Sequence, residues 1–231
     1  HFAEDVLAQG KADFIALARP FLADPDWPAK ARAGRDDEIR HCISCDYCRL
    51  ALRFTRPIRC LVNPEVGRER EFAAIEPARA VKNVLVVGGG PAGLEAARAA
   101  AARGHRVSLC ERGAELGGQL HLAALPPHKE KIEWLRDCLI TQARKAGVVV
   151  SVSTTFRPEA LAEGEVDAVV VATGARPCDE QLPGARAGQV VSAWDVLEGR
   201  PPAQASAAVV LGGWQMGCET AEFLAERGNR V

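Results

Sequence analysis

The sequence predicts an α/β fold built around a strand, a glycine-rich turn, a helix and a second strand. Residues 83–87 (NVLVV) are a short apolar run typical of a buried strand, and GGGPAG follows almost at once. An Ala-rich helix then extends to Arg103, and Gly104 suits its end. The apolar run 106–110 (RVSLC) supplies the second strand, so this part of the chain is expected to form one compact unit.

The same pattern occurs a second time. Residues 84–107 align without a gap on residues 208–231, which places Gly88 on Gly212. The repeat therefore predicts a second copy of the unit at the end of the chain.

The remaining elements are expected in the following order. Pro28 suits the first turn of a helix, where its missing N–H costs nothing. The segment from Arg40 to Pro77 is irregular and rich in Cys, Arg and Pro, so it is predicted to be a loop held by something other than a hydrophobic core. The other predicted elements are helices at 3–12, 28–34 and 128–146, and strands at 13–18, 148–153 and 167–174.

The amino-acid composition limits the kinds of partner that we expect this protein to bind. The 29 basic residues nearly balance the 30 acidic ones, so no overall field would attract nucleic acid or an anionic membrane. The longest apolar runs fall far short of the roughly 20 residues that cross a bilayer. We therefore expect no nucleic-acid partner and no membrane span.

The chain begins at His1 without Met and stops at Val231 in what resembles the start of a strand, so we interpret it as an internal piece of a longer protein. Four of the eight cysteines lie between Cys42 and Cys60, and the other four are scattered. This clustering favours a metal site in a reducing compartment, and hence a cytoplasmic location.

The first glycine turn predicts a nucleotide site. Gly88 permits the tight turn, Gly90 lets the backbone approach a pyrophosphate, and Gly93 lets helix and strand pack closely. Pro91 opens the helix, whose N-terminal N–H groups would face the phosphates. Further candidate contacts to the nucleotide are Ala92 in the same turn, Glu111, which can accept both ribose hydroxyls, and the adjoining Arg112.

Two further turns favour FAD, or at least its ADP half, over NAD in this unit. Gly118 and Gln119 resemble the second loop that FAD-binding domains wrap around the same nucleotide. Ala172 and Gly174 lie in an ATG turn that resembles a strand end of flavoproteins with two dinucleotides. Each turn alone is weak evidence, and the combination with Glu111 carries the prediction.

The clustered cysteines have the spacing CxxCxxC followed by a distant fourth. Three thiolates within seven residues can hold three corners of an iron–sulfur cubane, and the fourth closes the last iron. Structural zinc more often takes paired CxxC knuckles, so zinc and free thiols are the weaker alternatives. The predicted ligands are Cys42, Cys45, Cys48 and Cys60, whereas Cys110, Cys138, Cys178 and Cys218 are predicted to be small core residues.

Arg19 follows the strand predicted at 13–18 and precedes a helix. That is where barrel enzymes bind phosphate, and an arginine can clamp a phosphate through two hydrogen bonds. On this evidence alone Arg19 is either a phosphate ligand or part of a surface ion pair. The five histidines show no ligand spacing and are predicted to be surface or core residues.

The order of these parts resembles the iron–sulfur flavoproteins related to old yellow enzyme. That family includes 2,4-dienoyl-CoA reductase, bile-acid-inducible reductases, and trimethylamine and histamine dehydrogenases. The resemblance rests on ALARPFLADPDW, on the cysteine segment ending in CLVNP and on VLVVGGGPAGLEAA, and it covers essentially all 231 residues.

The resemblance implies an architecture and a set of cofactors. Residues 1–40 would be the C-terminal end of a TIM (β/α)8 barrel that holds FMN, with its phosphate on Ala18 and Arg19. Residues 41–80 would be an irregular iron–sulfur segment with a 4Fe-4S cluster, followed by a linker. Residues 81–183 would be a Rossmann-like domain for FAD or ADP, and residues 184–231 the start of an inserted NAD(P)-type domain.

The implied activity is electron relay between NAD(P)H, FAD, the cluster and FMN, which reduces an activated alkene of the enoate or dienoyl-CoA type. In the amine dehydrogenase branch the first unit holds only ADP, and electrons leave to an electron-transfer flavoprotein. The small-molecule substrate and the catalytic acid or base are not visible in these residues.

Trp214 keeps both branches open. It stands where the middle glycine of the second motif is expected, so an indole would obstruct the ordinary approach of a pyrophosphate. Gly212 and Gly217 still provide the turn and the close packing, so the fold is expected to survive while NAD(P)H binding is in doubt. The small subunit of glutamate synthase and a non-enzymatic zinc-stapled nucleotide-binding module are further alternatives.

Overall fold

The computed structural model describes residues 2–72, 76–163, 165–178, 182–185, 188–200 and 207–231. Residues 73–75, in the predicted linker, lie outside the described part. The chain divides into two compact units, His1–Ala74 and Ile75–Val231, which are described separately. In the described part, no helix has the length and apolar character needed to span a membrane.

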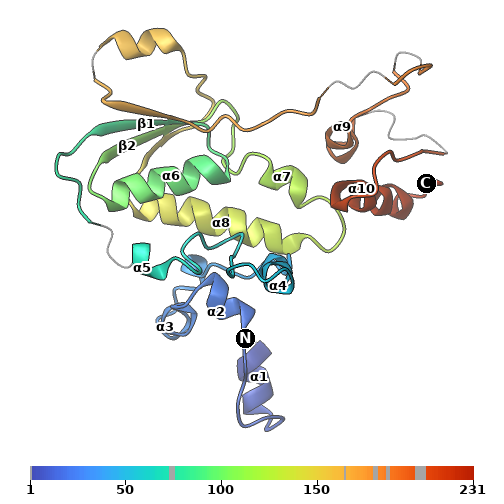
Figure 1. The fold of residues 1–231 in the computed structure, drawn as a ribbon, viewed down its shortest axis with the longest axis horizontal. Helices are drawn as coiled ribbons and strands as arrows, with labels where there is room; N and C mark the ends of the chain where they lie inside the picture. The colour runs from blue at the N-terminus through green and yellow to red at the C-terminus, as the bar shows by residue number, and fades with distance from the viewer. Residues whose placement is uncertain (1, 73–75, 164, 179–181, 186–187, 201–206) are drawn as a thin grey trace. The chain divides into compact units, whose positions relative to one another are not determined.

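A parallel four-stranded sheet organises the second unit (Figure 1). Its strands are β1 (Asn83–Val87), β2 (Arg106–Cys110), β3 (Val149–Ser151) and β4 (Ala168–Val171), in the order β3-β2-β1-β4. The central strand β1 pairs with β2 on one side and with β4 on the other. Chain connections therefore leave β1 in opposite directions, and this reversal creates a crevice at the carboxyl edge of such sheets.

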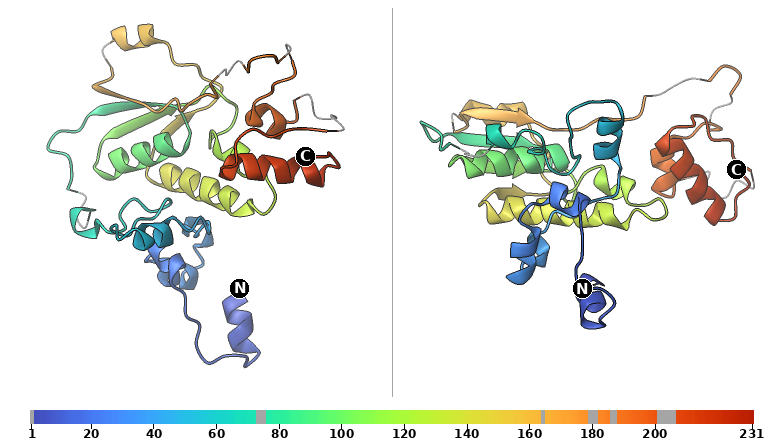
Figure 2. Two further views of the ribbon diagram at one scale, coloured as in Figure 1. Left: turned by 45° about the vertical axis from the view of Figure 1, so that its right-hand side comes forward. Right: turned by 60° about the horizontal axis from the view of Figure 1, so that its bottom comes forward.

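Two helices lie on the same side of this sheet (Figures 1 and 2). The helix α6 (Pro91–Ala102) packs on β1 and β2, and α8 (Glu130–Lys145) packs against α6. The short helix α7 (Leu120–Ala123) contacts α8. Val86, Leu94 and Leu109 are fully buried between sheet and helix, so the apolar runs of the sequence form the core.

The second copy of the repeat is only partly regular. Its helix α10 (Gln215–Glu226) packs against α9 (Ala193–Leu197), which precedes the second copy in the chain. Elsewhere in this unit, a turn of 3-10 helix, η2 (Pro158–Glu163), precedes β4. In the described residues, positions 208–211 of the second copy form no strand, and one isolated bridge joins Ala207 to Arg230. A strand requires a neighbour to receive its hydrogen bonds, and no other described segment pairs here.

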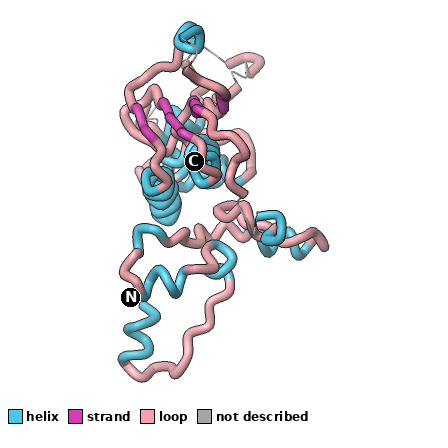
Figure 3. The backbone as a smooth tube through the Cα atoms, turned by 90° about the vertical axis from the view of Figure 1, so that its left-hand side faces the viewer, coloured by secondary structure: helices cyan, strands magenta, loops and turns pink. Residues whose placement is uncertain are grey.

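Helices and loops make up the first unit (Figure 3). The strand predicted at 13–18 is wrong, because this segment pairs with no described residue and forms no strand. The helix predicted at 28–34 is present one residue earlier, and the described part of the segment predicted as a loop contains two short helices. The elements are α1 (Phe2–Ala8), α2 (Arg19–Ala23), α3 (Trp27–Arg32), η1 (Asp36–Glu38), α4 (Tyr47–Arg53) and α5 (Glu69–Phe72).

Buried polar side chains hold this unit together alongside a small apolar core. The Asp24 carboxylate accepts hydrogen bonds from Lys30 Nζ (2.6 Å) and from the Arg40 backbone N–H (2.9 Å). Asn63 donates to the Leu22 carbonyl (2.9 Å) and accepts from the Arg40 guanidinium (3.3 Å). Asp24 and Asn63 are nearly inaccessible, so these bonds fix both ends of the cysteine segment.

Candidate functional site

The glycine turn after β1 has two positions where packing demands glycine. Gly88 has a φ of 109°, and a Cβ on it would lie 2.3 Å from the Ala172 carbonyl oxygen. A Cβ on Gly93 would lie 1.9 Å from the Gly88 carbonyl oxygen. Both contacts are far inside van der Waals distance, so these glycines let α6 begin directly against the strand ends, as the sequence predicts.

Gly90 differs from its neighbours because the protein itself does not require glycine there. Its φ of −75° suits any residue, and it is the N-cap of α6. A Cβ on Gly90 would have no protein atom nearer than the Gly118 Cα at 4.0 Å. The missing side chain therefore leaves open space at the N-terminus of a 12-residue helix, where an anion is stabilised. Pro91 and Ala92, exposed in the first turn, border this space.

Glu111 has a role in the turn that sequence reasoning missed. Its Oε2 accepts the Gly89 N–H and its Oε1 accepts the Gly113 N–H, both at 2.7 Å. Each carboxylate oxygen has further lone pairs, so Glu111 can brace the turn and still accept a hydroxyl. Gly113, two residues further on, was the only signal in the sequence near Glu111. Arg112 beside it is exposed.

The second and third loops meet the first at the carboxyl edge of the sheet. The Gly117 N–H donates to the Gly89 carbonyl at 2.8 Å, and Ala172 N–H donates to Val87 at the end of β1. Gln119 Nε2 donates to the Ala175 carbonyl at 3.2 Å, beside Gly174. The three turns that the sequence singled out therefore contact one another at the carboxyl edge of the sheet.

The second glycine motif reproduces the backbone of the first. Gly212 has a φ of 109°, equal to that of Gly88, and a Cβ on Gly217 would lie 1.8 Å from the Gly212 carbonyl oxygen. Trp214 takes the N-cap of α10 with a φ of −82°, so the indole causes no backbone strain. Its side chain is 88% exposed and stands where Gly90 leaves open space in the first copy.

The four clustered cysteines line one small cavity in the first unit. Cys60 is half-buried, and burial raises the pKa of its thiol, while hydrogen bonds from the backbone of Val62 and Asn63 lower it. The nearby Cys45 and Cys42 raise this pKa further. The remaining lining residues of the cavity are Arg19, Leu22, Ile43, Asp46 and Val62.

Arg19 forms an ion pair with Asp46, with its NH1 2.6 Å from Oδ1, and both side chains are about half exposed. This is one of the two roles that the sequence left open. Asp46 has a φ of 57° at the N-cap of α4 and also pairs with Arg49 at 3.0 Å. Asp46 was not singled out from the sequence, and its position between Cys45 and Cys48 was the only signal.

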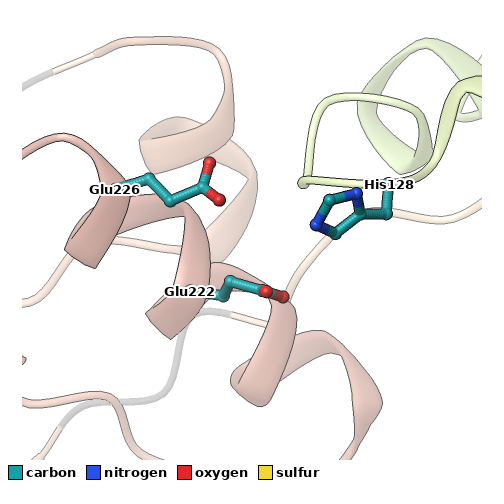
Figure 4. Close-up of side chains that lie close together, drawn as sticks. All are labelled: His128, Glu222 and Glu226. Carbon is teal, nitrogen blue, oxygen red and sulfur yellow. The ribbon is translucent and has the colours of Figure 1, made fainter.

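A His and two Glu side chains form a further cluster, between the loop before α8 and α10 (Figure 4). The ligand atoms of His128, Glu222 and Glu226 lie within 4.8 Å of one another, although the sequence showed no such spacing. All three side chains are exposed, and nothing else at this surface points to a ligand. Next to it, Lys129 forms an ion pair with Glu219 at 2.5 Å.

The parallel sheet, the glycine turn and the convergent loops define a dinucleotide-binding domain of the Rossmann-like class. The chain belongs to the pyridine nucleotide-disulphide oxidoreductase family, whose pattern it matches over residues 82–231. This match includes both copies of the repeat.

The chain is also similar to larger oxidoreductases. It is 46% identical over 235 residues to an NADH oxidase of Thermoanaerobacter brockii, covering 100% of this chain and 36% of that protein. A 2-naphthoyl-CoA reductase structure in complex with 2-naphthoyl-CoA has a TM-score of 0.90 at 34% identity, covering 98% of this chain and 34% of that one. The 6-hydroxypseudooxynicotine amine oxidase of Pseudomonas geniculata N1 has a TM-score of 0.85 at 32% identity, covering 98% and 36%. The chain therefore spans about a third of the length of these relatives.

Proposed function

We propose that the chain is the electron-relay part of a flavin- and iron–sulfur-containing oxidoreductase. One observation carries the proposal: three loops converge around Gly90, where neither backbone conformation nor packing accounts for a glycine. A dinucleotide whose pyrophosphate approaches the backbone accounts for it. When bound, FAD would exchange hydride and a cluster would pass single electrons.

FAD, or its ADP half, is the proposed ligand of the first glycine turn. The N-terminal N–H groups of α6 would face its phosphates, and Glu111 would accept hydroxyls of its ribose while still bracing Gly89. Gly118 and Gln119 would close over it from the second loop, and Gly174 would border it from the third. The remaining proposed contacts are Gly88, Pro91, Ala92, Gly93, Arg112 and Ala172.

A four-iron cluster is the proposed ligand of Cys42, Cys45, Cys48 and Cys60. A single zinc ion with sulfurs at about 2.3 Å would bring those sulfurs within roughly 3.8 Å of one another. Among the described residues, only the His128, Glu222 and Glu226 cluster brings three ligand atoms within 4.8 Å of each other. The four thiols line one common cavity, and three of them come from a CxxCxxC run, which supports a cubane with one thiolate at each corner.

FMN remains the proposed ligand of Ala18 and Arg19 in the parent protein. Arg19 would have to share or exchange its Asp46 partner to bind a phosphate. Because Arg19 and Asp46 border the cavity of the four cysteines, a phosphate at Arg19 would place FMN beside the cluster.

We propose NAD(P)H as the electron donor and an activated alkene, of the enoate or dienoyl-CoA type, as the small-molecule substrate. The likeness to the NADH oxidase and to the naphthoyl-CoA reductase supports both. Among the described residues no two cysteines are joined by a disulfide, in keeping with the cytoplasmic location that we propose.

An amine dehydrogenase that passes electrons to an electron-transfer flavoprotein is the second candidate. Trp214 favours it, since the indole occupies the place where NAD(P)H would need an open glycine. The likeness to the amine oxidase supports it as well.

In the deciding experiment the full-length protein is titrated under anaerobic conditions with NADH, with NADPH and, in separate samples, with methylated amines. Its visible spectrum is recorded after each addition. Bleaching by NADH or NADPH supports the reductase, whereas bleaching by methylated amines and by neither nucleotide supports the dehydrogenase. Iron, sulfide and zinc are measured on the same sample. Zinc without iron would refute the cluster and leave a zinc-stapled nucleotide-binding module.

A further inference from the structure

We infer that Arg136 and His121 are positioning residues that support the second nucleotide loop from behind, and that this support governs how firmly the loop retains its nucleotide. The inference deepens the proposed function and rests on it, because the loop concerned is the one proposed to close over FAD or ADP. Neither side chain belongs to the set proposed to touch the nucleotide.

The first observation is the reason for glycine at position 117. Gly117 has a φ of 119°, and a Cβ on it would lie 2.7 Å from Cγ and 2.8 Å from Cδ of Arg136. The same Cβ would lie 3.1 Å from His121 Nε2. The aliphatic stem of Arg136 and the imidazole therefore occupy the space that a side chain would fill, in direct contact with the loop backbone.

The second observation is a chain of hydrogen bonds that fixes both side chains. The Arg136 guanidinium can only donate, so the His121 Nδ1 at 3.3 Å must accept. With Nδ1 as the acceptor, Nε2 is the ring nitrogen that donates to the Leu116 carbonyl at 2.9 Å. Arg136 is itself oriented by Asp137, whose Oδ1 accepts from Nε at 2.9 Å. The loop is thus linked to α8 by one continuous set of contacts.

The third observation is the path from this support to the nucleotide crevice. The Gly117 N–H donates to the Gly89 carbonyl at 2.8 Å. A Cβ on Gly118 would lie 3.0 Å from the Gly90 Cα, so the two loops touch backbone to backbone. A displacement of Gly117 would therefore open the crevice at Gly90.

Arg136 and His121 face away from that crevice. Both line an open basin together with Thr141 and Arg144, and no residue of the glycine turn lines it. They can act on the nucleotide only through the loop, which separates their role from that of the proposed contact residues. Arg144 offers a matched control, since it lies eight residues further along α8, about 12 Å away.

The test uses full-length protein purified with its nucleotides. The release of FAD or ADP after dilution is followed by chromatography of the filtrate, which separates both from FMN. Arg136→Ala removes stem and donor and should speed release about tenfold, whereas Arg136→Met keeps most of the stem and should speed it only two- to threefold. His121→Leu should speed release about fivefold, and His121→Gln, which can donate to Leu116 and accept from Arg136, should restore the slow rate. Arg144→Met should not change it.

The melting temperature of nucleotide-free protein is measured for every variant. A variant that releases its nucleotide faster at an unchanged melting temperature supports the positioning role. If instead every variant with faster release also has a correspondingly lower melting temperature, the two side chains have a merely structural role and the inference is overturned. If the wild-type protein carries FAD or ADP and the variants release it at the wild-type rate, the inference is overturned while the proposed function stands. Wild-type protein that carries neither nucleotide would overturn the proposed function together with it.

Discussion

Gly90 and Gly93 lie three residues apart and are glycine for different reasons. A Cβ on Gly93 would strike the Gly88 carbonyl at 1.9 Å, whereas a Cβ on Gly90 would meet no protein atom within less than 4.0 Å. We expect Gly93→Ala to lower the free energy of unfolding by about 3 kcal/mol. Gly90→Ala should leave stability within about 1 kcal/mol of the wild type, because its φ suits alanine.

Urea unfolding of both variants and their FAD or ADP content give the comparison. Gly90→Ala should weaken nucleotide retention while remaining folded, because the methyl group enters the proposed pyrophosphate space. A Gly90→Ala protein that keeps its nucleotide as tightly as the wild type would contradict the assignment of this space.

The cysteines outside the cluster segment differ in reactivity. Burial raises the pKa of the Cys110 thiol, a backbone hydrogen bond partly opposes this, and the neighbouring Glu111 carboxylate adds a smaller increase. Cys138 is also buried, whereas Cys178 and Cys218 are exposed, contrary to their prediction as core residues. Alkylation of native protein near pH 7, mapped by mass spectrometry, should therefore modify Cys178 and Cys218 first. Equal labelling of Cys110 would contradict the burial of β2.

At the scale of elements, the first unit depends on the buried Asp24 carboxylate. Asp24→Ala leaves the half-buried Lys30 ammonium and the Arg40 N–H without their acceptor. We expect a loss of about 3 kcal/mol of local stability. Hydrogen exchange at residues 19–66 should then become about 100-fold faster. Asp26→Ala, an exposed neighbour, is the matched control and should leave exchange unchanged.

The proposed cluster ligands in the cysteine segment give a further prediction. Cys45→Ser removes one proposed corner of the cluster and should abolish the broad visible absorbance together with most of the iron and sulfide. Cys218→Ser removes an exposed thiol outside the segment and should leave both unchanged. Cluster absorbance retained in Cys45→Ser would overturn the ligand assignment.

The elements of the second unit could be predicted because local pattern and pairing agree there. The strands at 83–87 and 106–110 and the helix that ends at Arg103 are confirmed, as each buries an apolar run against the others. The strand predicted at 13–18 is wrong, since its apolar pattern finds no partner strand in the described residues. Pattern alone cannot supply a hydrogen-bonding neighbour.

The glycines of the candidate site could be predicted from the sequence, whereas the side chains that hold its loops in place could not. Spacing identified the first loop, because Gly88, Gly90 and Gly93 follow a strand and precede a helix, whereas the second and third loops rested on a resemblance to turns of flavoproteins. The partners of Arg19 and Glu111 and the packing of Arg136 on Gly117 depend on side-chain directions that spacing does not encode.

At the scale of the whole molecule, Trp214 decides whether the two copies of the repeat have the same function. Trp214→Gly would restore open space at the N-terminus of α10 without changing its backbone, since a φ of −82° suits both residues. If the indole blocks the site, we expect the apparent affinity of the full-length protein for NADH or NADPH to rise about tenfold. Anaerobic reduction rates at several nucleotide concentrations measure it.

Wild-type protein that is already reduced rapidly, with no gain in Trp214→Gly, would show that the indole swings aside. Trp214→Phe is the matched control, because it keeps an aromatic ring at the N-cap and should behave as the wild type.

The central place of β1 in the sheet has a consequence for the synthesis of the protein. Its one neighbour, β2, is made soon after it, but the other edge closes only when β4 is complete. The bond from the Asn83 N–H to Asp167 Oδ2 joins residues 84 positions apart. At about 5–20 residues per second, a ribosome needs roughly 4 to 17 s to cover that distance. During this interval the nascent chain exposes an unpaired apolar strand edge, the feature that chaperones and aggregating neighbours both bind.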